Sequence, residues 1–192
     1  MALQRGAETR AAIDPARIGF RALQADDLPL LHRWLNNPRV YRWYGGAAPT
    51  FAEVEAKYAA RIAGRSPTRP YLILHADTPV GYIQTYRVAD DADYAAIVGD
   101  SGGAAAVDMF IGEDASAGRG LGAAALRAFL QESVFSDPAL IRCFIDPHPD
   151  NSVAIRAYIR VGFSPLRRVD PAPPAEPCLL LSIERTAIEG EG

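Results

Sequence analysis

Hydrophobic and polar residues follow one another along the chain in patterns that predict strands and helices in a mixed order. Residues 18–23 alternate like a strand, and leucines at 28, 31 and 35 have the spacing of one helix face. Thr50 and Glu53 form the capping-box signature of a second helix that reaches about Ile62. The strand-like runs 71–75 and 80–88 are separated by turn residues, and so they predict a hairpin.

The second half of the chain alternates strands with helices. Residues 89–103 are rich in Asp and Gly and predict an irregular excursion. Beyond it we expect a strand at 105–111, a glycine-rich turn at 118–122, a helix to about 135, a strand at 140–145, a helix at 151–160, and strands near 163–169 and 178–183. This order predicts a mixed α/β sheet with helices on both faces, in one domain over 16–186 with flexible tails at 1–15 and 187–192.

Composition narrows the class of protein. The 192 residues fit one domain, and the net charge of −3 lacks the basic footprint of a general nucleic-acid binder. No apolar run approaches the roughly 20 residues needed to cross a bilayer, and the start has no signal-peptide pattern. Cys143 and Cys178 stand far apart without metal-ligand spacing. We therefore expect a cytoplasmic protein, monomer or homodimer, without a metal, nucleic acid or membrane partner.

Two neighbouring segments suggest a binding site for a phosphorylated molecule. In Ala117-Gly118-Arg119-Gly120-Leu121-Gly122, glycines between a strand and a helix let backbone N–H groups converge, and the helix adds its positive dipole end. Alone, such a turn is often only structural. About thirty residues later, the predicted helix 151–160 places Asn151, Ala154 and Tyr158 on one stripe before Gly162-Phe163.

These two segments resemble motifs of the GNAT superfamily of acetyl-coenzyme A-dependent N-acetyltransferases. The resemblance as a whole covers roughly residues 18–183. The resemblance implies a mixed, mostly antiparallel sheet with splayed central strands and helices on both faces. Ala117 departs from the Gln or Arg that is usual there. The resemblance implies that Tyr158 protonates the leaving thiolate and that backbone near 109–111 supplies a hydrogen-bond donor. The coenzyme contacts it implies are Met109, Phe110, Ile111, Ala117, Gly118, Arg119, Gly120, Leu121, Gly122, Asn151, Ala154 and Tyr158.

A narrower resemblance is to aminoglycoside 6′-N-acetyltransferases. Several short segments carry it, among them Trp43-Tyr44-Gly45-Gly46, residues 81–86, Val107-Asp108 and residues 146–151. Related acyltransferases of hydroxamate siderophore synthesis usually carry His at the place of Asp108, which favours the aminoglycoside reading. The resemblance implies a substrate pocket lined by Trp43, Tyr44, Tyr58, Gln84, Tyr86, Asp100, Asp108 and Asp146.

The charge pattern agrees with a cationic substrate. Between Arg87 and Arg119 there is no basic residue, but there are seven acids: Asp90, Asp91, Asp93, Asp100, Asp108, Glu113 and Asp114. Asp108 lies among apolar residues of a predicted central strand, where an unpaired carboxylate is costly and therefore indicates a site, or else a partner for an arginine. An ammonium has no lone pair for attack, so a carboxylate that holds the amine and accepts its proton suits acetyl transfer. We expect Asp108 in that role, with Asp146 as a second amine-binding carboxylate.

Two other functions stay open at this point. The same chemistry could act on a siderophore precursor or another small amine. A non-enzymatic module that binds acyl-coenzyme A is the third possibility, favoured only by Ala117.

Overall fold

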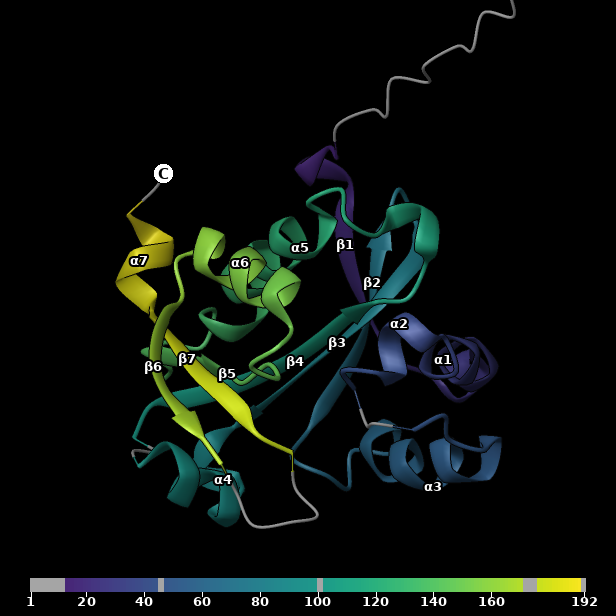
Figure 1. Cartoon of the computed structure of the whole chain (residues 1–192), viewed down its shortest axis with the longest axis horizontal. Helices are drawn as coiled ribbons and strands as arrows, with labels where there is room; N and C mark the ends of the chain where they lie inside the picture. The colour runs from purple at the N-terminus through teal and green to yellow at the C-terminus, as the bar shows by residue number, and fades with distance from the viewer. Residues whose placement is uncertain (1–12, 45–46, 100–101, 171–175, 191–192) are drawn as a thin grey trace, which may run out of the picture.

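One mostly antiparallel sheet forms the centre of the computed structural model, which describes residues 13–44, 47–99, 102–170 and 176–190. Within this part of the chain the sheet has seven strands in the order β1-β2-β3-β4-β5-β7-β6 (Figure 1). Every neighbouring pair is antiparallel except β4 and β5. The predicted sheet type is confirmed. The strands are β1 (Ile18–Ala22), β2 (Arg69–His75), β3 (Thr78–Arg87), β4 (Ala104–Ile111), β5 (Arg142–Ile145), β6 (Ser164–Val169) and β7 (Cys178–Glu184).

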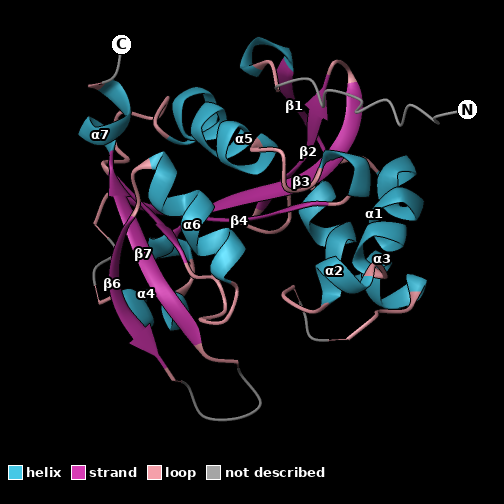
Figure 2. Cartoon of the chain, turned by 45° about the horizontal axis from the view of Figure 1, so that its top comes forward, coloured by secondary structure: helices cyan, strands magenta, loops and turns pink. Residues whose placement is uncertain are grey.

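Helices cover both faces of the sheet. Successive side chains of a strand point to opposite faces, and the central strands carry apolar residues on both. Odd-numbered residues such as Ile83 and Val107 pack against α5 and α6, whereas Tyr82 and Phe110 pack under α1 and α3. Figure 2 shows these helix groups on either side of the sheet. The helices are α1 (Leu28–Leu35), α2 (Pro38–Tyr41), α3 (Phe51–Ile62), α4 (Ala92–Val98), α5 (Leu121–Phe129), α6 (Ser152–Val161) and α7 (Arg185–Glu189).

The parallel strands β4 and β5 separate soon after they meet. Their register runs over three residue pairs, from Ala104 opposite Arg142 to Ala106 opposite Phe144. Strand β4 continues to Ile111 beside β3, while β5 ends at Ile145. The central strands are therefore splayed, and the stretch of β4 around Asp108 lies at the opening.

The prediction of an irregular excursion at 89–103 is wrong in part, because α4 lies inside it. Asp91 caps this helix by accepting a hydrogen bond from the N–H of Tyr94 at 3.0 Å, and Gly99 ends it with a positive φ of 78°. The ring of Tyr94 is buried against the sheet beside Tyr86. Asp91 thus caps α4, and Asp90 and Asp93 are exposed at its start.

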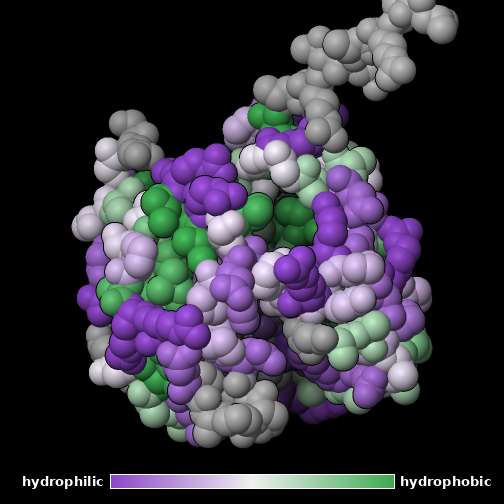
Figure 3. Space-filling view, viewed as in Figure 1, coloured by the Kyte–Doolittle hydropathy of each residue, from purple (hydrophilic) through white to green (hydrophobic). Residues whose placement is uncertain are grey.

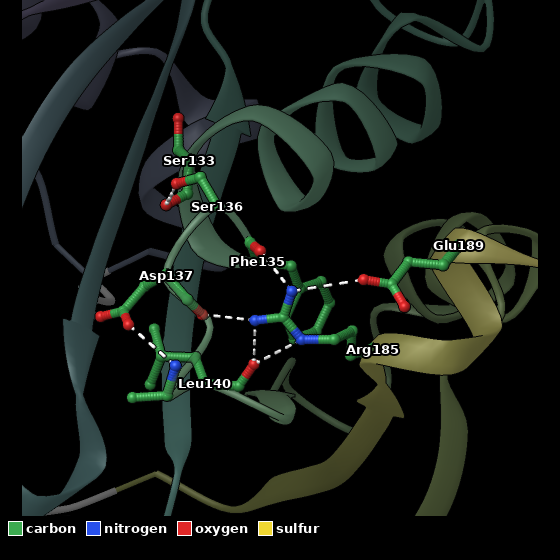
Figure 4. A network of polar contacts seen from close by, with 8 residues as sticks. Ser133, Phe135, Ser136, Asp137, Leu140, Arg185 and Glu189 are labelled. Atoms are coloured by element: carbon green, nitrogen blue, oxygen red, sulfur yellow. Dashed lines mark hydrogen bonds and ion pairs between the residues drawn. The ribbon is translucent and has the colours of Figure 1, made fainter.

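Parts of both segments expected to be tails, 1–15 and 187–192, have regular structure or core contacts where the structure describes them. Ile13 packs against the core, and Pro15–Arg17 form a 3₁₀ turn. At the other end, residues 187–189 belong to α7, whose Ile188 is buried. Arg185 fixes this helix, because its guanidinium donates to the carbonyl oxygens of Phe135, Asp137 and Leu140 (Figure 4).

Candidate active site

A hydrogen-bonded amide and carboxylate lie at the opening between β4 and β5. Gln84 of β3 is directly opposite Asp108 of β4 in the antiparallel register. Side chains of such pairs are on the same face of a sheet, and here Gln84 Nε2 donates to Asp108 Oδ2 at 2.6 Å. Two residues predicted for the substrate pocket are thus brought together.

Two donors to its amide oxygen fix the orientation of the Gln84 side chain. Its Oε1 accepts from Arg61 Nη1 and from the Tyr82 hydroxyl, each at 2.7 Å. With both donors on Oε1, the amide nitrogen must face Asp108. Gln84 is itself buried. One of its three hydrogen bonds holds Asp108 and the other two fix the amide itself, so its part in lining the substrate pocket stays a prediction.

Two opposing influences act on the carboxyl of Asp108. Burial raises its pKa, because the charged form is poorly solvated there. The hydrogen bond from Gln84 and the positive charges of Arg61 and Lys57 lower it again. The net direction is upward, which suits a group that accepts a proton from an ammonium.

Asp146, just beyond the end of β5, is electrostatically coupled to Asp108. Burial, and then the negative charge of Asp108, raise the pKa of Asp146 to about 7. The Tyr94 hydroxyl opposes this rise without completing a hydrogen bond of normal geometry. Two neighbouring carboxyl groups whose pKa values are both raised, despite the positive charges of Arg61 and Lys57, favour a bound cation.

The raised pKa of Asp146 should make the free energy of unfolding depend on pH. An acid whose pKa rises on folding binds more protons in the folded chain, so stability falls as pH increases from about 4 to about 7. We expect Asp146→Asn to raise the free energy of unfolding at pH 8 by roughly 1 kcal/mol or more. Urea denaturation at pH 5 and pH 8 would measure it. Asp150→Asn, at an exposed carboxylate, is the matched control, and a loss of stability in Asp146→Asn at pH 8 would contradict the argument.

Aromatic side chains surround these carboxylates. The ring centroid of Trp43 is 5.5 Å from that of His148, which brings the segment after α2 against the loop after β5. Tyr44 packs edge-on against Phe110 at 5.0 Å, and Tyr86 lies against Tyr94. Trp43, Tyr44 and Tyr86 thus lie on the acceptor side of the sheet, and their contact with a substrate stays a prediction.

Tyr58 differs from its predicted place in the pocket lining. Its side chain has no exposed surface and packs edge-on against Tyr82, with the guanidinium of Arg61 over its ring at 5.1 Å. Its hydroxyl is buried without a hydrogen bond. Tyr58 thus supports the site from beneath and presents no surface to a sugar ring.

The glycine loop forms the start of α5 on the other face of the sheet. Gly118 and Gly120 have φ values of +69° and +85°, in the left-handed region that favours glycine. No side chain caps α5, so its first backbone N–H groups have no side-chain acceptor. A Cβ at either glycine would meet nothing within 4 Å. The loop thus offers backbone N–H groups of the kind that bind a phosphate, and its role as the coenzyme site stays a prediction.

The other coenzyme residues implied by the resemblance divide between the two faces. Met109, Ile111 and Ala154 pack against the same core cluster as α5 and α6. The Phe110 side chain lies on the opposite face among the aromatic rings under α1 and α3, so only its backbone can face the coenzyme. Leu121 is a buried core residue, whereas Ala117 and Arg119 are partly exposed in the loop.

Asn151 is the N-cap of α6 and Tyr158 lies within this helix, which packs beside α5. Asn151 Oδ1 accepts from the Ala154 N–H at 3.2 Å and caps the helix, which leaves its Nδ2 to donate to a ligand. Tyr158 is mostly buried, and its pKa is raised by burial and by the charges of Asp108 and Asp146. Its hydroxyl therefore keeps its proton and lies within the field of both carboxylates.

The two halves of the site meet at the splay between β4 and β5. Even-numbered Asp108 faces the acceptor side, and odd-numbered Met109 and Ile111 face the glycine loop. Figure 3 shows the surface hollowed between the part over α5 and α6 and the part over α1–α3. A thioester held on one face could thus reach an amine held on the other.

Comparison with known proteins agrees with this geometry. Residues 24–171 match the model of the acetyltransferase (GNAT) domain. The chain belongs to the GNAT acetyltransferase family. It is 30% identical over 174 residues to aminoglycoside N(6′)-acetyltransferase type 1 of Klebsiella pneumoniae, covering 90% of this chain and 85% of that protein. The acetyltransferase AAC(6′)-Ib bound to paromomycin and acetyl-CoA superposes with a TM-score of 0.80 at 30% identity, over 90% of this chain and 96% of that one.

A second solved structure gives the same relation. AAC(6′)-Ib in complex with coenzyme A and kanamycin has a TM-score of 0.80 at 29% identity, over 91% of this chain and 98% of that chain. The GNAT fold expected from the sequence is confirmed. In the described part of the chain, no helix has the length and apolar character to span a membrane, and no cluster of His, Cys, Asp and Glu has the form of a metal site.

The acidic stretch of this acetyltransferase does not form one pocket. Glu113 pairs with Arg33 and accepts from Trp34 Nε1, and Asp114 pairs with Arg39. These acids fasten the loop after β4 to α1 and α2. Asp90 and Asp93 are exposed near α4, and Asp100 lies outside the described residues. Asp108 is the one described acid of the stretch placed in the site.

Sequence reasoning missed two basic residues of α3, Lys57 and Arg61. A pocket for a polycation gave no reason to expect them, but their i, i+4 spacing on the helix that carries Tyr58 was visible. Arg61 Nη1 donates a hydrogen bond to Gln84 Oε1. The negative charge of Asp108 acts on Lys57 in the direction that raises its pKa.

Loss of Arg61 should be visible in the pH profile of the acetyltransferase. Arg61→Met removes one donor from Gln84 and a positive charge near Asp108, so the pKa of Asp108 should rise. We expect kcat/KM at neutral pH to fall about tenfold, the effect of one charge-assisted hydrogen bond. The acid limb of the kcat/KM profile should move to higher pH, with partial recovery in Arg61→Lys. Arg65→Met, an exposed arginine just past α3, should change neither quantity.

Proposed function

We propose that the protein transfers the acetyl group of acetyl-CoA directly to the 6′-amine of an aminoglycoside and so confers antibiotic resistance. The observation that carries the proposal is the placement of Asp108. Its carboxylate is held by Gln84 on the aromatic, acidic side of the splay, opposite the glycine loop at the start of α5. The similarity to aminoglycoside acetyltransferases over nine-tenths of the chain supports the same substrate class. Its partners are then small molecules, and we propose a cytoplasmic location, where acetyl-CoA is made.

Each residue has a role in the proposed reaction. Asp108 and Asp146 bind the substrate's ammonium groups, and Asp108 accepts the proton that the attacking amine must lose. Backbone N–H groups of β4 near residues 109–111 stabilise the oxyanion that develops at the thioester carbonyl. Tyr158 supplies a proton to the departing thiolate, while Gly118–Gly122 and Asn151 bind the coenzyme.

Steady-state kinetics would test the substrate class. Turnover of acetyl-CoA should be rapid with kanamycin or tobramycin and weak with an N-hydroxylysine-type amine. No acetylation of any aminoglycoside would contradict the proposal, and preference for the hydroxylamine would assign the enzyme to siderophore chemistry.

A further inference from the structure

Lys57 is unusual in this chain because it is the only lysine. The other 19 of the 20 Lys and Arg residues are arginines, whose guanidinium stays protonated and is not a nucleophile at neutral pH. Lys57 Nζ is therefore the single side-chain primary amine of an enzyme that acetylates amines.

This amine lies on the acceptor side of the site. Lys57 Nζ is 5.8 Å from the ring centroids of both Tyr44 and Tyr58. Tyr44 in turn packs at 5.0 Å against Phe110, two residues beyond Asp108 on β4. Arg61, one helical turn along α3, contacts the amide that holds Asp108. The flexible four-carbon stem of Lys57 starts from this wall of the site.

The surroundings also favour the neutral form of the amine. The side chain of Lys57 keeps exposed surface, but partial desolvation of its ammonium group, followed by repulsion from Arg61, lowers its pKa, and the negative charge of Asp108 partly opposes this change. A larger fraction of Lys57 is thus unprotonated at neutral pH than for a solvated lysine, and only that form can attack a thioester.

We propose that Lys57 is an internal acetyl acceptor, so that the enzyme acetylates its own Lys57 when acetyl-CoA is bound and no amine substrate is present. The thioester C–S bond breaks and a C–N amide bond forms at Nζ. One proton of the amine passes to Asp108, and the thiolate takes a proton from Tyr158. The product is a neutral acetyl-lysine, which removes one positive charge from beside Asp108. The inference rests on the proposed function in that both use the same acceptor site.

Mass spectrometry of the intact enzyme tests this directly. The purified wild-type protein is incubated with acetyl-CoA alone, and peptide mapping separates Lys57 from the amino terminus. The matched control is Arg65→Lys, which adds a second lysine at an exposed position just past α3. In that variant Lys57 should be acetylated at least about tenfold faster than the introduced lysine, because Lys57 lies on the wall of the acceptor site within the electrostatic reach of Asp108. Asp108→Asn should slow the modification of Lys57 to the rate of the introduced lysine.

Each result decides the matter. Lys57 left unmodified, or modified at the rate of the introduced lysine, overturns the inference, as does a rate unchanged by Asp108→Asn. Kanamycin turnover is measured on the same preparation, so the two proposals are separated. Turnover without modification of Lys57 rejects only the internal acceptor. Modification of Lys57 without aminoglycoside turnover rejects only the proposal that an aminoglycoside is the substrate.

Discussion

Asp108→Asn is expected to lower kcat/KM for an aminoglycoside at least about 100-fold, the usual scale for losing a general base. Asn has nearly the same shape and can still accept a hydrogen bond from Gln84 Nε2 through its carbonyl oxygen. It carries no charge and cannot take a proton from an ammonium. Initial rates over a range of kanamycin concentrations, at saturating acetyl-CoA, would measure the loss.

Two measurements keep this result specific to the chemistry. The dissociation constant for coenzyme A, measured by calorimetry, should be unchanged in Asp108→Asn, because the glycine loop lies on the other face of the sheet. Asp93→Asn removes an exposed acid from the same acidic stretch and should leave the rate near that of the wild type. Wild-type kinetics in Asp108→Asn would show that this carboxylate is not the base.

Gly122→Asp should abolish most of the affinity for coenzyme A without unfolding the protein. Gly122 is in the first turn of α5, and a Cβ there would lie 3.7 Å from Ile111 Cγ1, at ordinary contact distance. A carboxylate in the first turn of a helix is favourable for the helix itself. It would, however, repel a pyrophosphate a few ångströms away by several kcal/mol at an intermediate dielectric. We expect the dissociation constant to rise at least about 100-fold.

Calorimetric titration with coenzyme A would measure this change, and thermal unfolding would verify the fold. Gly122→Ala is the matched control, since it adds the same Cβ without charge, and its affinity should stay within a few-fold of the wild type. Equal losses in both variants would mean that crowding is responsible and that the loop does not bind the phosphates.

Local signals in the sequence were sufficient for most of the fold. The capping box of α3 forms as predicted, with Thr50 and Glu53 bonded to each other's backbone N–H groups. The predicted hairpin turns through Ala76 and Asp77, both at positive φ. These elements depend on neighbours a few residues away, and the sequence therefore contains the information needed to predict them.

The misread segment shows how composition can hide such signals. Asp91 and Gly99 stand at the two ends of α4 and are a normal N-cap and a normal left-handed C-cap. Counting Asp and Gly as signs of irregular structure obscured their positions at the ends of an alanine-rich helix.

The site was predictable only as far as the strands determine it. Alternation along β4 separates Asp108 from Met109, and pairing with β3 places Gln84 beside Asp108. The contact between Arg61 and Gln84 depends on how α3 crosses the sheet, which no local pattern specifies. The same limit applies to Glu113 and Asp114 of the acidic stretch, because their pairing with Arg33 and Arg39 depends on where α1 and α2 lie.

The strand order has a consequence for how the chain folds during synthesis. β7 follows β6 in the sequence but lies between β5 and β6 in the sheet. Until residues 178–184 leave the ribosome, one edge of β5 stays unpaired, including its apolar residues Cys143 and Phe144. An exposed apolar edge can pair with other chains. A nascent chain of this enzyme is therefore most prone to aggregation just before its last strand is made.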